Sequence, residues 1–174
     1  MLRTQAIAYA ATALAFLALD SVWLGTMAQR LYRPNIGHLM QEGVSFAPAV
    51  VFYLLYVAGM VFFAVVPGVE KQSWQQALGL GAALGLVAYA TFGLTNQAVL
   101  RDWPWHVTAM DMAWGTVATG AASAIASSTS ARWSCQARSS PAAFAKVAAS
   151  SAIPCIPSCC AAAMVAQKTA EPAL

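Results

Sequence analysis

The chain has 174 residues, of which 60% are hydrophobic and only 9% are charged, and its formal net charge is +3. Soluble domains carry roughly 25% charged residues, so the composition excludes an ordinary soluble domain and favours a protein whose main partner is the lipid bilayer. The positive charge is not gathered into a basic run with interleaved aromatic residues, and we therefore expect no nucleic-acid partner.

Four apolar runs approach or exceed the roughly 20 residues that a helix needs to cross a bilayer. Backbone polar groups in lipid must be paired within the segment, so we expect each run to be a helix. The first run is longer than a signal-peptide core and lacks a small-residue cleavage pattern, which indicates a retained span. The runs cover residues 5–28, 46–66, 77–100 and 105–126.

The runs are separated by polar, proline-containing connections, QRLYRPNIGHLMQEG, PGVEKQS and RDWP, and Pro104 suits the first turn of the fourth helix. The predicted fold class is all-α, an integral membrane antiparallel four-helix bundle formed by residues 1–127. Four spans place both termini on one side of the membrane. Basic residues in the C-terminal tail weakly favour the cytoplasmic side for both.

Small residues recur at a spacing of four in the third and fourth runs, at Gly81 and Gly85 and at Gly115, Thr119 and Ser123. Such residues let membrane helices approach each other closely. We expect them to pack within the chain, with homo-oligomerisation through the same faces as the alternative.

Two aspartates interrupt the apolar runs, Asp20 near the end of the first and Asp111 near the start of the fourth. An acidic group at such a depth costs about 2.5–3.5 kcal/mol on insertion scales unless it has a partner or water. Because the two helices run in opposite directions, both carboxyl groups are expected about 10–12 Å below the same membrane face. Each aspartate is followed three residues later, on the same helical face, by a tryptophan, Trp23 or Trp114.

Further polar residues are expected on that side of the membrane, so we predict a water-accessible recess that opens toward the first and third connections. In one reading the recess binds a small ligand, a lipid or a proton. In the other, each aspartate is satisfied structurally by Asn96, a tryptophan indole or an arginine. The candidate binding residues are Asp20, Trp23, Arg33, His38, Asn96, Asp111 and Trp114, and no catalytic residue is assigned.

Three classes of function remain open. The first is a transport or sensing protein that binds a cation or proton, although four spans leave little room for alternating access. The second is a membrane enzyme acting on a lipid-like substrate, with an aspartate as base and His38 or His106 as its partner. The sequence contains no serine elbow, metal-spaced histidine pair or phosphate loop, so no cofactor and no metal site is expected. The third class is a scaffold, and ligand binding in the polar recess is the leading hypothesis.

Five ordered blocks carry a family resemblance: LDSVWLG, LYRPNIGHL, FYLLYVAGMVFFAV, GLVAYATFGLTNQAVLRDWP and TAMDMAWGT. Over about residues 2–122 the chain resembles the bacterial membrane-protein family catalogued as domain-of-unknown-function family 2177. The resemblance implies a small four-helix protein of the bacterial inner membrane and no particular activity. The family motif residues present are Asp20, Trp23, Gly25, Tyr32, Arg33, Gly37, His38, Thr95, Asn96, Asp111, Trp114 and Gly115.

The chain departs from the family pattern in two places. At Gly93 the resemblance implies a third carboxylate, so an activity that needs three acids is not implied here. Residues 128–174 form an Ala/Ser-rich tail without apolar periodicity, which indicates a GC-rich gene read out of frame or an unrelated disordered segment. In this tail, Pro154 and Pro157 argue against a fifth span, and the CIPSCC cluster lacks histidine partners for a metal.

Overall fold

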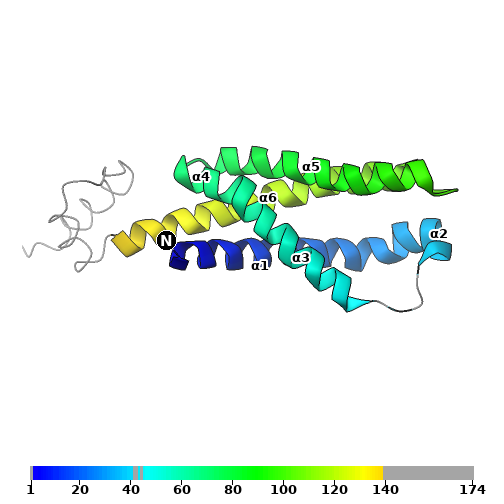
Figure 1. Ribbon diagram of the computed structural model, residues 1–174, viewed down its shortest axis with the longest axis horizontal. Helices are drawn as coiled ribbons and strands as arrows, with labels where there is room; N and C mark the ends of the chain where they lie inside the picture. The colour runs from blue at the N-terminus through cyan, green and yellow to red at the C-terminus, as the bar shows by residue number, and fades with distance from the viewer. Residues whose placement is uncertain (1, 41–42, 44, 139–174) are drawn as a thin grey trace, which may run out of the picture. The chain divides into compact units, whose positions relative to one another are not determined.

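The computed structural model describes residues 2–40, 43 and 45–138, and this part of the chain contains helices and no strand, which confirms the all-α class. Met1–Ser130 form one compact unit, and a second unit begins at Ala131. In chain order the helices are α1 (Leu2–Met27), the π-helical segment η1 (Ala28–Tyr32), α2 (Arg33–Ile36), the 3₁₀ helix η2 (Gly37–Leu39), α3 (Phe46–Met60), the π-helical segment η3 (Val61–Val65), α4 (Val66–Glu70), α5 (Trp74–Val99) and α6 (Trp105–Arg138) (Figure 1).

Three continuous helical stretches are long and apolar enough to cross a membrane: Gln5–Leu39, Phe46–Glu70 and Trp74–Val99. Their outward side chains are large and apolar, as Leu14 and Phe62 illustrate with 72% and 71% of their surface exposed. In water, so much exposed apolar surface would be unusual for a monomer, whereas it suits contact with lipid chains. These stretches correspond to the first three predicted spans.

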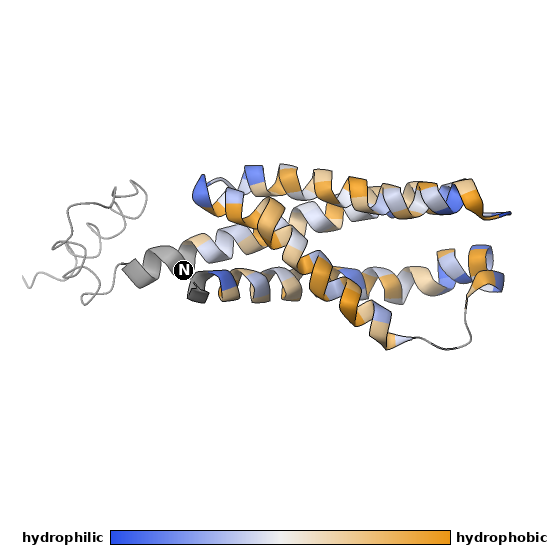
Figure 2. Ribbon diagram, in the orientation of Figure 1, coloured by the Kyte–Doolittle hydropathy of each residue, from blue (hydrophilic) through white to orange (hydrophobic). Residues whose placement is uncertain are grey.

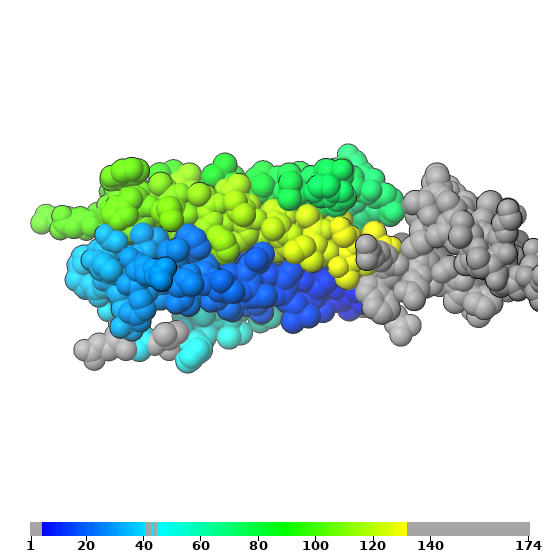
Figure 3. All heavy atoms as spheres, turned by 180° about the vertical axis from the view of Figure 1, so that it is seen from behind, coloured from blue at the N-terminus to red at the C-terminus, as the bar shows by residue number. Residues whose placement is uncertain are grey.

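Helix α6 is less apolar than the other long helices, as its paler ribbon in Figure 2 shows, because alanine, glycine, serine and threonine fill much of it. Its small polar side chains are enclosed by protein, since Thr119 and Ser123 have no exposed surface. Figure 3 shows the surface of α6 between those of α1 and α5. A helix shielded by its neighbours exposes little surface to lipid, so α6 could cross the membrane despite its low hydropathy. That α6 forms the fourth span stays a prediction.

Two helical stretches continue beyond their expected ends, and a proline follows a π-helical segment in both. The first run was expected to end at residue 28, yet helical structure reaches Leu39. Segments η1 and η3 end two residues before Pro34 and Pro67. Proline lacks an N–H and its ring clashes with the carbonyl of the preceding turn, and a widened π turn absorbs this conflict. Most of the first connection, which was expected to separate two spans, is therefore helix.

The two short turns that flank α5 have clear local causes. Gln72 adopts a φ of 52° and Asp102 a φ of 59°, a left-handed conformation that Asp tolerates better than most residues. Ser73 begins α5 by accepting a hydrogen bond from the backbone N–H of Gln76 at 3.2 Å. This serine followed by glutamine three residues later forms the spacing of a capping box, which explains why the helix starts at Trp74 and not at residue 77.

Small residues bring α5 and α6 into backbone contact. A Cβ atom added to Gly85 would overlap the carbonyl oxygen of Gly115, and one added to Gly81 would lie 2.5 Å from the Oγ of Ser123. The small-residue faces predicted from the sequence are therefore used for packing within the chain.

A hydrophobic cluster joins the four long helical stretches. Phe16 of α1 and Met60 of α3 are fully buried with Ala118 and Ala122 of α6, and Leu84 of α5 packs against them. The ring of Phe16 also contacts two tyrosines of α3, Tyr53 and Tyr56, with centroid distances of 6.3 and 5.2 Å. This packing fixes the direction in which the two tyrosines extend.

Helix α6 extends to Arg138, although the fourth span was expected to end at residue 126. The physical reason is composition: residues 121–140 contain neither glycine nor proline, and alanine is the best helix former. The expectations about a fifth span around Pro154 and Pro157 and about the CIPSCC cluster concern residues outside the described part of the chain.

Candidate functional site

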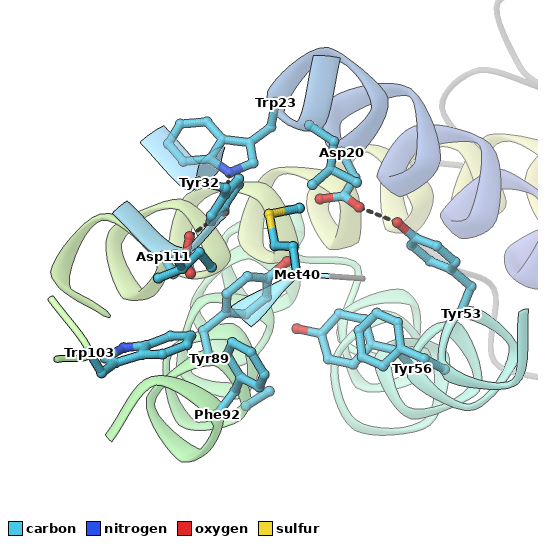
Figure 4. A pocket seen from close by; sticks show the side chains of 14 residues that line it. Asp20, Trp23, Tyr32, Met40, Tyr53, Tyr56, Tyr89, Phe92, Trp103 and Asp111 are labelled. Carbon is cyan, nitrogen blue, oxygen red and sulfur yellow. Dashed lines mark hydrogen bonds between the residues drawn. The ribbon is translucent and has the colours of Figure 1, made fainter. Parts of the chain in front are cut away.

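A cavity of about 500 Å³ lies within the compact unit, and Asp20 of α1 and Asp111 of α6 both line it. Its volume falls within the range of about 300–1,000 Å³ that is common for ligand sites. The walls are mostly aromatic, as the close view in Figure 4 shows. The aromatic lining residues are Trp23, Tyr32, Phe52, Tyr53, Tyr56, Tyr89, Phe92 and Trp103.

Asp20 is held by a tyrosine of a different helix. Only 6% of its surface is exposed, and the hydroxyl of Tyr53 in α3 donates a hydrogen bond to its Oδ2 atom. Figure 4 shows this bond at one side of the cavity. The bond joins α1 to α3 at the level of the apolar cluster.

Asp111 is held by a relay of two hydrogen bonds. The hydroxyl of Tyr32 donates to Asp111 Oδ1 at 2.5 Å, and the indole Nε1 of Trp23 donates to the same hydroxyl at 3.0 Å. Asp111 is 4% exposed. The relay connects α1, η1 and α6.

The π-helical segment explains how Tyr32 reaches Trp23. Nine residues separate them, which in a regular α-helix is about two and a half turns and would place them on opposite sides. Tyr32 is the last residue of η1, whose wider turn rotates it toward the face of Trp23. Single π turns within α-helices are frequently found at functional sites.

The two Asp-x-x-Trp motifs meet in the folded chain. The ring of Trp23 stacks on that of Trp114 with centroids 4.5 Å apart and planes 7° from parallel. The buried Nε1 of Trp114 has no hydrogen-bond partner in the described part of the chain. Trp114 thus supports Trp23 and is not itself a lining residue.

Of the candidate binding residues, the cavity brings together Asp20, Trp23 and Asp111. Arg33 and His38 are exposed and do not line it, and Asn96, half-buried in α5, does not line it either. The expectation that Asn96, an indole or an arginine directly satisfies the aspartates is wrong, because both partners are tyrosine hydroxyls.

Neither histidine of the chain lines the cavity. His106 has its Nε2 atom 3.0 Å from Oδ1 of Asn35, at the end of the helical stretch that contains η1. His38 is exposed in η2. The proposed pairing of an aspartate base with a histidine is therefore not formed among the described residues.

Three tyrosines of the cavity, Tyr53, Tyr56 and Tyr89, were not predicted from the sequence. Tyr56 shares a hydrogen bond of 2.8 Å with the hydroxyl of Thr119. A tyrosine at the edge of a span belongs to the interfacial belt, whereas one in mid-span needs a partner for its hydroxyl. The positions of these residues within the second and third runs were the available signal.

Trp103 forms part of the cavity wall through a cluster centred on Thr108. Its Nε1 donates to Thr108 Oγ1 at 2.9 Å. That hydroxyl lies 3.3 Å from the carbonyl of Gly93 and 3.2 Å from Oε1 of Gln97, and it can donate to either. A Cβ at Gly93 would lie 2.7 Å from Cγ2 of Thr108. A side chain at this position, where the resemblance implies a third carboxylate, would therefore require Thr108 to shift.

The cavity has a one-sided charge composition. Its lining includes two carboxyl groups and no arginine, lysine or histidine among the described residues. One oxygen of each carboxyl group accepts a tyrosine hydrogen bond. No hydrogen bond from a described residue reaches Oδ1 of Asp20 or Oδ2 of Asp111.

Over residues 5–128 the chain matches the model of a family described as predicted membrane protein (DUF2177). This range contains every residue of the cavity lining. The comparisons with curated proteins and with solved structures gave no match.

Proposed function

This chain belongs to the DUF2177 family of predicted membrane proteins, and we propose that it binds a small ligand in the cavity that Asp20 and Asp111 line. The observation that carries the proposal is the pairing of two deeply placed carboxyl groups with an aromatic cavity of about 500 Å³. A site with a mostly apolar wall and few convergent polar groups is typical of small-molecule binding.

The energetic argument concerns the unpaired half of each carboxyl group. Keeping an acidic side chain at membrane depth is costly, and such residues commonly mark a binding site or a proton path. Tyr53 and Tyr32 satisfy one oxygen of Asp20 and of Asp111. A ligand or proton bound at the second oxygen of each carboxyl group would supply the missing partner. The two aspartates would then have a binding role in addition to joining helices.

The setting of the site is also part of the proposal. We place the chain in the bacterial inner membrane with four spans and both termini in the cytoplasm. The recess then opens on the opposite side, toward the connection that contains Gly43 and the turn that contains Asp102. Ligand would enter from that side or from the outer leaflet of the bilayer.

A structural role is the second candidate, and one observation favours it. Each aspartate bonds a tyrosine of a different segment, so Asp20 joins α1 to α3 and Asp111 joins α6 to η1. If this were their whole purpose, the carboxyl charge would be dispensable. The reading as an enzyme has less support, since no histidine lines the cavity among the described residues.

Filling the cavity tests the proposal. Ala88 lies in its wall, and Ala83 is exposed on the same helix. We expect native mass spectrometry of the detergent-purified protein to detect a copurified small molecule or lipid that survives in wild type and in Ala83→Phe but is lost in Ala88→Phe. Identical bound species in all three proteins would argue against a ligand in this cavity.

A further inference from the structure

The charges around the cavity restrict the sign of its ligand. Asp20 and Asp111 come from two different helices, are more than nine-tenths buried, and have no basic residue beside them in the lining. An anionic group would be repelled by the two carboxylates and would find no basic side chain in the lining. A positive charge would compensate both carboxyl groups at the depth where compensation matters most.

The aromatic wall restricts the ligand further. A cation over an aromatic face within about 6 Å of the ring centre gains about 0.5–2 kcal/mol, and rings of this kind form cages for quaternary ammonium groups. The ring of Tyr53 lies beside Asp20, to which its hydroxyl donates, and the rings of Tyr56, Tyr89 and Trp103 line the same cavity (Figure 4). The combination of rings and acids suits an organic ammonium group better than a neutral molecule.

An inorganic divalent cation fits less well. Calcium takes six to eight oxygen ligands, and magnesium requires a near-ideal octahedron. The described residues contain no group of three or more His, Cys, Asp or Glu side chains that could hold a metal. Most of the wall is hydrocarbon ring surface, which offers no ligand to a hard cation.

The rim of the cavity indicates an apolar body. Leu24, Met40, Phe52 and Phe92 line it and are each at least 43% exposed. These side chains lie between the acids and the surroundings of the bundle, so a molecule that enters must pass over apolar surface. An amphipathic ligand places its hydrocarbon part there and its charge deeper.

We propose that the cavity binds a lipophilic organic cation, with its ammonium or equivalent positive centre between Asp20 and Asp111 and its apolar body against the aromatic wall. This inference rests on the proposed function and names the chemical class of its ligand.

Two probes of the same shape and opposite charge test the sign. Binding of radiolabelled tetraphenylphosphonium and tetraphenylborate to the full-length protein in nanodiscs would be measured by scintillation proximity. We expect the cation to bind saturably and about tenfold more tightly than the anion. Equal binding, or tighter binding of tetraphenylborate, would overturn the proposal, and this comparison needs no variant.

Variants locate the effect. Asp20→Asn with Asp111→Asn keeps the shape and the tyrosine acceptors but removes both charges, and we expect a loss of about tenfold in affinity for the cation. Asp102→Asn makes the same chemical change at an exposed turn and should leave the affinity within about twofold. An unchanged affinity in a folded double variant would place the cation elsewhere.

A neutral probe separates the two levels of the proposal. If N-phenyl-1-naphthylamine binds in a manner that Ala88→Phe abolishes, but the cation shows no dependence on the aspartates, the cavity binds ligands and the assignment of a cation fails. If Ala88→Phe changes the binding of no probe, the ligand-binding function fails as well.

Discussion

The indole of Trp23 lies flat against the indole of Trp114, 4.5 Å between ring centroids, and so joins the two Asp-x-x-Trp motifs of the chain. One motif comes from α1 and the other from α6, and the two tryptophans are 91 positions apart in sequence. The stack positions Trp23, whose N–H in turn holds the Tyr32 hydroxyl that binds Asp111. Trp114, which does not line the cavity, therefore supports the geometry of a carboxyl group inside it.

The stack predicts that Trp114→Ala lowers stability more than removal of an exposed tryptophan. Aromatic pairs contribute about 0.5–1.5 kcal/mol beyond the area they bury. We expect a lower melting temperature in detergent for Trp114→Ala, a smaller decrease for Trp114→Phe, and almost none for Trp74→Ala, whose side chain is 52% exposed. Equal melting temperatures for Trp114→Ala and Trp74→Ala would show that the stack contributes nothing.

The relay through Tyr32 predicts a cost when its hydroxyl is removed. Tyr32→Phe deprives Asp111 of a donor and the Trp23 indole of an acceptor, and an unsatisfied buried polar group costs about 1–3 kcal/mol. Tyr9→Phe is the matched control, because the Tyr9 hydroxyl makes one exposed bond of 3.1 Å to a carbonyl. Thermal unfolding should rank Tyr32→Phe well below Tyr9→Phe, and the reverse order would contradict the relay.

The tight contact at Gly93 predicts overpacking that a second change relieves. Gly93→Ala places a methyl group against Cγ2 of Thr108 and should destabilise the protein by about 1–3 kcal/mol. Thr108→Ser removes that methyl group, keeps the hydroxyl that Trp103 uses, and should restore much of the loss. Gly79→Ala, with open space around it, should be neutral or slightly stabilising. Failure of Thr108→Ser to rescue Gly93→Ala would mean that the strain lies elsewhere.

The four-span arrangement predicts the side on which each connection lies. Reporter fusions at Ser73 and Ser130 should agree with each other, and a fusion at Gly43 should report the opposite side. Agreement between Gly43 and Ser73 would mean that Phe46–Glu70 does not cross the membrane. Agreement between Gly43 and Ser130, with Ser73 on the opposite side, would show that α5 and α6 do not both cross.

The parts of this protein that could be predicted from sequence are those set by local composition. Apolar runs predicted three membrane-length helices. The positions of Asp20 and Asp111 within two runs predicted a shared site, and both residues line the same cavity. The partners of the aspartates could not be found in this way, because Tyr53 is 33 residues from Asp20 and Tyr32 is 79 residues from Asp111. The hydropathy of a run includes the contribution of its tyrosines but does not determine the direction of their side chains.

The π-helical turns are the other feature that escaped prediction. Pro34 lies in the first polar connection, and proline usually ends a helix, whereas the widened turn of η1 lets the helix continue. That turn also rotates Tyr32 toward the cavity. Because the helix was not expected to continue past residue 28, Tyr32 was not predicted as a binding residue. Asn96 was expected in the site because of its position along the third run, but it does not line the cavity. The position of a residue along a helix does not determine which face of the helix it occupies.

The central claim, a water-accessible recess lined by two acids, is tested most directly by thiol labelling at position 88. In a chain whose four cysteines are replaced by serine, Ala88→Cys would be compared with Ala83→Cys in membranes. We predict that Ala88→Cys reacts with a cationic trimethylammonioethyl methanethiosulfonate faster than with its anionic sulfonatoethyl analogue, after correction for their rates with a free thiol, and that Ala83→Cys reacts with neither. Equal inertness at both positions, or a preference for the anion at position 88, would contradict the account.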